Sequence, residues 1–472
     1  MRLKSLPPWI FAAASSLFAS LPSLLAAEAE WRVDLARENG ALTLRWPDAG
    51  ADWAYTVQAL PTIGNIWIAP RSTRPWPIAG TSWEAGSAAL PANFYRVLAV
   101  PRAERGKALV TTTLPTLTKA ELSFIFLFAG VPLTPQFDVA VRRIQYETVG
   151  PWGGRTLASG LLLLPVGATR PLPLVVYQHG TLARKADAPS AQASQERYIG
   201  AAYASTGYAA VLPDYLGLGD SPGFHPYHHA VTEATAGVDL LRAARAYCAA
   251  QGIALNGQLF LTGYSQGGHA AAALQRELEE FHADEFLVTA AAPMAGAYDL
   301  SGTTADEMLS GRPQPNPYYL AYLLAAYQDV YRLAPSFAEL LRAPYNVTLP
   351  PLLDGQHGGS EINAVLPQAP APPTDIIKPE YLAAFRADPD HPLRRALRDN
   401  DLVHWTPKAP VRLYHCSGDR DVPPQNSAVA HAAFVSRGAD ATLWDPRPGA
   451  DHGDCVLPAM LAAKVWFDSL KE

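Results

Sequence analysis

Ser265 occupies a position that suits a nucleophilic serine. It is the centre of Gly-Tyr-Ser-Gln-Gly at 263–267, between the apolar run 258–262 and an alanine-rich stretch that begins at 268. The flanking glycines permit a tight reversal from a strand into a helix. A serine in that turn faces the free N–H groups and the positive dipole end of the helix, which favour the negative charge that develops in acyl transfer. The pattern therefore predicts Ser265 as a nucleophile, whereas the pentapeptide alone would indicate only a glycine-rich turn.

A serine alcohol attacks well only when a base takes its proton and a carboxylate holds that base in one tautomer. His452 lies in the glycine-flanked loop 449–455, directly before the last predicted helix, and is the predicted base. His431 lies within a predicted helix and is the weaker candidate. The acid is expected in the turn after an apolar run near the C-terminus, where both Asp419 and Asp421 occur.

The chain order of serine, acid and histidine resembles that of the α/β-hydrolase superfamily over residues 105–472. The resemblance implies the α/β-hydrolase fold, which belongs to the α/β class and has a mostly parallel central sheet with helices on both faces. In that superfamily the acid usually lies three residues after a glycine and shortly before Val-Pro, so Gly418 implies Asp421. Asp419 remains the alternative, because Cys416 stands where such loops often have a glycine.

Two backbone N–H groups are expected to form the oxyanion hole. The resemblance implies Gln266, the residue after the nucleophile, as the first donor. The apolar run 173–177 leads into Gln-His-Gly-Thr at 178–181, which is similar to the His-Gly loop that many α/β hydrolases carry at this point. It implies Thr181 as the second donor, and a simple β-turn is the alternative interpretation of the loop.

Asp214 belongs to the segment 213–221, Pro-Asp-Tyr-Leu-Gly-Leu-Gly-Asp-Ser, which resembles a stretch found in many relatives after the fourth core strand. A carboxylate upstream of the nucleophile does not fit the superfamily order of the acid. We therefore expect Asp214 to have a structural role, satisfying backbone N–H groups in a tight loop.

Histidines also gather at His225, His228 and His229. No cysteine or group of carboxylates lies near them in the sequence to complete a metal ligand set. We therefore expect no metal and no cofactor, and we interpret this segment as part of a pocket wall. His269 follows the predicted nucleophile on the helix and is expected to pack in the interior or to support the site.

The chain has three cysteines. Cys416 lies on the loop of the predicted acid and Cys455 on the loop of the predicted base, so a disulfide between them is a hypothesis for an oxidising compartment. Three titratable thiols in the denatured, unreduced protein would contradict it. Cys248, in the predicted helix 240–250, is expected to be a buried free thiol.

Composition limits the possible partners. The 472 residues are 49% hydrophobic and 17% charged, which is typical of a globular protein with a large core. The net charge is −6 and the sequence pI is about 6.1, so no basic field favours nucleic acid. Residues 1–27 resemble a secretory signal peptide, with cleavage after Ala27 or Ala29. We expect a secreted or periplasmic protein without stable membrane insertion.

Two further regions flank or interrupt the hydrolase-like part. Alternating apolar runs separated by Pro and Gly clusters predict a small all-β sandwich at 30–101, similar to fibronectin type III or immunoglobulin-like modules. Its aromatic side chains either fill a small core, which we favour, or bind a polymer. The tryptophans are Trp31, Trp46, Trp53, Trp67, Trp76 and Trp83. An insertion at about 301–409, rich in aromatic residues and leucine, predicts a helical cap over the site.

The motifs are most similar to those of bacterial carboxylesterases and secretory lipases. The prediction is a secreted serine hydrolase that cleaves small-molecule or polymeric carboxylic esters through an acyl-enzyme. A serine peptidase of the same fold is the nearest alternative, and a non-catalytic polymer-binding protein is a third. Acyl and alcohol specificity and the oligomeric state depend on shapes that composition does not determine.

Overall fold

The computed structural model describes residues 32–38, 41–70, 76–85, 94–192 and 194–472. The predicted signal peptide at 1–27 lies outside the described residues, as does Trp31. Within the described residues, no helix combines the length and the apolar character that a membrane span requires.

A nine-stranded sheet forms the centre of the fold, in the order β14-β13-β12-β11-β9-β10-β8-β7-β6. The strands from β9 to β14 pair in parallel, and β6, β7, β8 and β10 pair antiparallel with one another. This is the mostly parallel sheet that the sequence predicts. The strands are β6 (Ala108–Leu117), β7 (Val139–Val149), β8 (Arg155–Pro165), β9 (Leu172–Gln178), β10 (Ala209–Pro213), β11 (Leu255–Tyr264), β12 (Ala290–Met294), β13 (Val411–Tyr414) and β14 (Ala441–Trp444).

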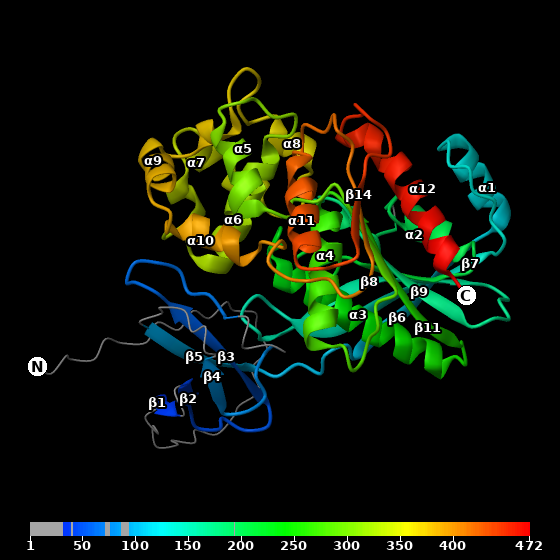
Figure 1. The fold of residues 1–472 in the computed structure, drawn as a ribbon, viewed down its shortest axis with the longest axis horizontal. Helices are drawn as coiled ribbons and strands as arrows, with labels where there is room; N and C mark the ends of the chain where they lie inside the picture. Colours follow the sequence, from blue (N-terminus) through cyan, green and yellow to red (C-terminus); the bar gives the residue numbers. More distant parts are fainter. Residues whose placement is uncertain (1–31, 39–40, 71–75, 86–93, 193) are drawn as a thin grey trace, which may run out of the picture. The chain divides into compact units, whose positions relative to one another are not determined.

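Helices cover both faces of the sheet (Figure 1). Every residue of β9 is buried, and its side chains divide between the faces: Leu174 and Val176 pack on one, Val175 and Tyr177 on the other. Such continuous apolar runs are typical of parallel strands covered on both sides. One face packs against α3 (Ala230–Ala250), α4 (Gln266–Phe281) and α11 (Gln425–Ser436), the other against α1 (Lys119–Phe128), α2 (Arg197–Ala204) and α12 (His452–Leu470).

A helical insertion lies between β12 and β13, where the sequence predicts a cap. It has a core of its own, in which Tyr322, Leu324 and Tyr327 of the central helix α6 (Tyr318–Tyr331) are buried. The other helices are η3 (Leu300–Thr304), α5 (Ala305–Leu309), η4 (Phe337–Leu340), α7 (Tyr345–Thr348), η5 (Pro350–Leu352), α8 (Gly359–Asn363), η6 (Pro373–Ile376), α9 (Pro379–Ala387) and α10 (Pro392–Asp399). Short helix η2 (Lys185–Asp187) precedes α2.

The N-terminal part has two small antiparallel sheets. One has the order β1-β2-β4, from β1 (Asp34–Glu38), β2 (Ala41–Arg45) and β4 (Ser82–Ala85); the other pairs β3 (Trp53–Leu60) with β5 (Phe94–Pro101). Trp46 and Trp83 are buried in a small apolar cluster with Tyr55 and Val57. Trp76 is buried as well, whereas Trp53 is 40% exposed. Most of the described tryptophans therefore fill the interior, which is the interpretation that the sequence favoured.

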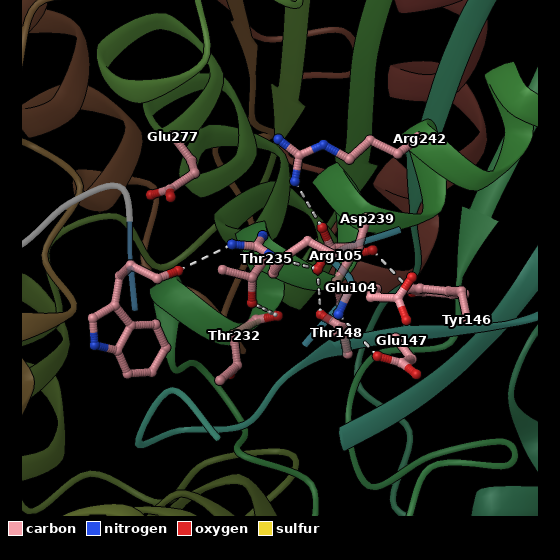
Figure 2. A network of polar contacts seen from close by, with 12 residues as sticks. Glu104, Arg105, Tyr146, Glu147, Thr148, Thr232, Thr235, Asp239, Arg242 and Glu277 are labelled. Atoms are coloured by element: carbon pink, nitrogen blue, oxygen red, sulfur yellow. Dashed lines mark hydrogen bonds and ion pairs between the residues drawn. The ribbon is translucent and has the colours of Figure 1, made fainter. Parts of the chain in front are cut away.

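A buried carboxylate fixes α3 against the antiparallel edge of the sheet (Figure 2). Asp239 is fully buried and accepts hydrogen bonds from Arg105 Nε at 2.6 Å, Thr148 Oγ1 at 2.6 Å and Arg242 Nη1 at 3.0 Å. A buried charge is tolerated when it is paired and hydrogen-bonded in this way. The cluster therefore joins α3 to β7 and to the segment before β6.

Candidate active site

Ser265 lies in the turn between β11 and α4, as the sequence predicts. Its backbone has φ of 62°, a left-handed value that is rare for a residue with a side chain and common at functional turns. The turn is tight on both sides. A Cβ on Gly263 would lie 2.2 Å from the carbonyl oxygen of Gly267, and a Cβ on Gly267 would lie 1.9 Å from the carbonyl oxygen of Gln178. Only glycine fits at these two positions, so the turn requires the residues that flank the serine.

His452 is the first residue of α12, and it lies beside Ser265. Its Nε2 is 2.9 Å from Ser265 Oγ, and its Nδ1 is 2.5 Å from Asp419 Oδ2. The Tyr264 hydroxyl donates a hydrogen bond of 2.7 Å to the carbonyl oxygen of His452. The structure thus brings together a hydroxyl, an imidazole and a carboxylate from three distant segments, while His431 remains on α11.

The structure does not place the predicted acid, Asp421, against His452, because Asp419 occupies that position. Asp419 Oδ1 accepts hydrogen bonds of 2.9 Å from the backbone N–H groups of Asp421 and Val422, so the carboxylate closes its own turn and faces inward. The side chain of Asp421 points elsewhere and accepts a hydrogen bond of 2.8 Å from Asn316. Asp bonding to the backbone two residues ahead is common turn chemistry. Here it turns the carboxylate of Asp419, and not that of Asp421, toward His452.

His415 is a further residue of this site to which the sequence assigned no role. Its Nε2 lies 3.2 Å from Asp419 Oδ2, and its Nδ1 lies 2.7 Å from Ser427 Oγ. Burial acts to raise the pKa of Asp419, but hydrogen bonds from His415 and His452 outweigh it and hold that pKa well below its ordinary value. Asp419 is therefore ionised at neutral pH and can orient a histidine. The available signal was the position of His415 at a strand end, four residues before Asp419.

The acid loop and the base loop are in direct contact. Cys416 and Cys455 form a disulfide, with 5.9 Å between their Cα atoms. A Cβ on Gly418 would lie 2.3 Å from the carbonyl oxygen of Gly449, so the two loops pack backbone to backbone. Cys248 is a buried free thiol. Covalent and packing constraints thus hold Asp419 near His452.

The two predicted oxyanion donors lie on neighbouring loops. A Cβ on Gly180 would be 3.8 Å from Ser265 Cβ, so the loop that carries Thr181 lies against the turn of the serine. Within the described residues, no hydrogen bond engages the backbone N–H of Gln266 or Thr181. The Thr181 hydroxyl pairs with the Tyr227 hydroxyl at 2.9 Å. Free N–H groups beside a nucleophile are suited to bind an oxyanion.

A cavity of about 60 Å³ adjoins this region. Two of its lining residues contact the site: the Tyr227 hydroxyl pairs with the Thr181 hydroxyl, and the Val422 N–H donates to Asp419. Its wall is largely apolar and comes mostly from the insertion. The lining residues are Tyr227, His228, Ala297, Leu300, Thr304, Glu307, Met308, Gln314, Tyr319, Leu320, Leu323, Asp421, Val422 and Pro423.

The remaining sequence candidates lie outside the serine, histidine and aspartate group. Asp214 is fully buried and accepts hydrogen bonds from Ser190 N at 2.8 Å and Ser159 Oγ at 2.6 Å, so it stabilises a loop, as predicted. His225 donates from Nδ1 to the carbonyl oxygen of Leu216 at 2.8 Å. His269 is fully buried behind the turn.

Comparisons with known proteins agree with this fold. The secretory lipase family matches residues 182–314. No curated protein sequence gives a match. The structure of LipA from Xanthomonas oryzae, a rice cell wall degrading esterase, is 31% identical, with 77% of this chain and 96% of that chain covered and a TM-score of 0.66.

Two further structures extend the comparison. A putative hydrolase from Legionella pneumophila is 28% identical, with 77% of this chain and 98% of that chain covered and a TM-score of 0.71. Lipase A of Candida antarctica is 18% identical, with 74% and 78% covered and a TM-score of 0.56, a likeness of fold alone.

Proposed function

The chain belongs to the esterases and lipases of the α/β-hydrolase superfamily and is a carboxylic ester hydrolase, and we propose that it acts through an acyl-enzyme formed on Ser265. The carrying observation is the continuous hydrogen-bonded chain from Ser265 Oγ through both ring nitrogens of His452 to Asp419. In this proposal Asp419, rather than Asp421, is the acid.

The reaction follows from the roles of these atoms. His452 Nε2 takes the hydroxyl proton while Ser265 Oγ attacks the ester carbonyl carbon. The negative charge on the carbonyl oxygen is stabilised by the N–H groups of Gln266 and Thr181. His452 then gives the proton to the leaving alcohol. A water molecule, activated by the same imidazole, releases the carboxylic acid and restores the serine.

We also propose the domain organisation and the location. Residues 30–101 form a fibronectin type III or immunoglobulin-like module, and residues 105–472 form the catalytic domain, with a cap at about 301–409. Secretion is supported by the match to the secretory lipase family and by the disulfide, since disulfides persist in oxidising compartments. The substrate is a small or polymeric ester. The apolar cavity beside the Thr181 loop is proposed to hold part of it.

The test compares wild type with Ser265→Ala on p-nitrophenyl esters of graded acyl length, on an esterified polysaccharide and on a chromogenic peptide. We expect ester turnover in the wild type, and a loss on the order of 10⁴ to 10⁶ in kcat in the variant, because the nucleophile is gone. Peptide cleavage without ester cleavage would contradict the proposal, and so would full ester turnover by a folded Ser265→Ala variant.

A further inference from the structure

Three buried side chains meet behind the turn of Ser265. His228 precedes α3, Glu233 lies in the first turn of α3, and His269 lies in the first turn of α4. They are 7%, 1% and 0% exposed, and one nitrogen or carboxylate oxygen from each lies within 4.8 Å of the others. Glu233 follows His228 by five residues in the sequence, and the fold adds a second imidazole, His269 of α4.

Of these three side chains, His228 has a ring nitrogen without a partner. Its Nδ1 is buried and has no hydrogen-bond partner within the described residues. Burying a polar atom without a partner is unfavourable. The backbone of His228 also has φ of 54°, a strained value for a residue other than glycine. A strained, buried residue that has an unpaired nitrogen and lies beside a carboxylate and a second imidazole is suited to bind a cation.

The other two side chains are oriented as metal ligands usually are. His269 Nε2 lies 3.0 Å from the carbonyl oxygen of Asn400, which can only accept, so Nε2 carries a proton. In the neutral ring Nδ1 then presents a lone pair, 2.7 Å from Glu233 Oε2. Glu233 Oε1 accepts a hydrogen bond of 2.9 Å from Gln266 Nε2. Outer hydrogen bonds to a carbonyl and to an amide are the contacts that fix ligating histidines and carboxylates.

Two cations could lie between His269 Nδ1 and Glu233. A proton on Nδ1 would satisfy these two groups, but it would leave His228 Nδ1 without a partner. A metal ion would bind all three side chains. Ligand atoms bound at about 2 Å in a tetrahedral site lie about 3.3 Å apart. The most distant pair of the cluster therefore has to approach by up to about 1.5 Å, and His269 Nδ1 and Glu233 Oε2, now 2.7 Å apart, have to separate by about 0.6 Å.

We propose that His228, Glu233 and His269 bind one divalent transition-metal ion, for which Zn²⁺ has the best chemistry. Two imidazoles and one carboxylate form a ligand set typical of zinc, with a fourth position left for water. Because Glu233 also holds the side chain of Gln266, the ion stabilises the turn that carries Ser265. It takes no part in the proposed ester hydrolysis, and the inference is independent of it.

The experiment uses the full secreted chain and measures metal directly. Wild type expressed with Zn²⁺ and dialysed against metal-free buffer should retain about one zinc per chain by atomic emission, and Co²⁺ in its place should give a tetrahedral visible absorption spectrum. His228→Asn should lower the affinity for Zn²⁺ at least tenfold and abolish the Co²⁺ spectrum. Because His228 Nδ1 has no hydrogen-bond partner in the described residues, the substitution removes no hydrogen bond at that atom. Circular dichroism of the variant checks that it is folded.

The matched control is His357→Asn, which removes a histidine from a half-exposed pair with Asp354 at 2.9 Å, outside the cluster. It should bind zinc as wild type does, and so should Ser265→Ala. A metal-free wild type whose melting temperature does not respond to Zn²⁺ would overturn the proposal, leaving a protonated His269 paired with Glu233. Equal zinc binding by wild type and a folded His228→Asn variant would overturn it as well. If that variant does not fold, His228→Gln and the Co²⁺ spectrum of wild type decide the question.

Discussion

Asp419 and Asp421 lie in the same turn but have opposite surroundings. Asp419 is buried and accepts hydrogen bonds from His452, His415 and two backbone N–H groups. Asp421 borders the cavity and pairs with Asn316. A carboxylate orients an imidazole only through direct contact, so the two residues should differ greatly in their effect on turnover.

We expect Asp419→Asn to lower kcat on p-nitrophenyl esters by about 10⁴, because the amide no longer fixes the histidine tautomer. Asp421→Asn is the matched control, with the same change two residues away, and it should alter kcat less than about tenfold. Steady-state kinetics of both variants measures this. A larger loss in Asp421→Asn than in Asp419→Asn would restore Asp421 as the acid.

At the scale of elements, the site depends on where strands and helices end. β11 and α4 meet at Ser265, the turn after β13 carries Asp419, and α12 begins at His452. The carboxyl ends of parallel strands share one edge of the sheet, which is where ligands bind in open α/β folds. The insertion after β12 leaves from the same edge and forms most of the cavity wall, in part through α5 and α6.

The cavity wall can be tested on α5. Met308 lines the cavity and Leu309, the next residue, does not. Met308→Ala should enlarge the cavity and favour longer acyl chains, by about fourfold in relative kcat/KM for each extra methylene that becomes buried. Leu309→Ala removes a similar apolar side chain and should leave the chain-length profile unchanged. The acyl series of p-nitrophenyl esters measures both, and an identical shift in the two variants would contradict the assignment of the cavity to substrate.

At the scale of the whole molecule, one covalent bond reinforces the layered core. The disulfide closes a loop across 39 residues, which contains β14, α11 and the start of α12. The residues that it encloses include both Asp419 and His452. Chain entropy then predicts that the disulfide raises the free energy of unfolding by about 4 kcal/mol.

Replacing both bridging cysteines, Cys416→Ala with Cys455→Ala, should therefore lower the free energy of unfolding by about 4 kcal/mol in denaturant titration. Turnover should fall as well, because the acid and base loops lose their link. Reduction of the wild-type disulfide should lower both the free energy of unfolding and the turnover in the same way. Cys248→Ala is the control: on reduction, its free energy of unfolding should fall as much as that of wild type. A double variant as stable as wild type would show that packing of Gly418 against Gly449 suffices.

The amino-acid sequence by itself determined the α/β-hydrolase fold, the strand, turn and helix around Ser265, and the position of His452 close to the start of the last helix. These features depend on local patterns: apolar runs, glycines in a tight turn and the order of motifs along the chain. They can be predicted because neighbours in the sequence produce them.

Only the tertiary structure decided between Asp419 and Asp421, and only it brought His269 of α4 to His228 and Glu233. Both outcomes depend on contacts between distant segments. Asp419 faces His452 because its own carboxylate closes the turn and because Gly418 lets the loop pack on Gly449. Spacing along the chain does not encode the direction in which a side chain points, since that direction follows from backbone hydrogen bonds and packing that exist only in the folded protein.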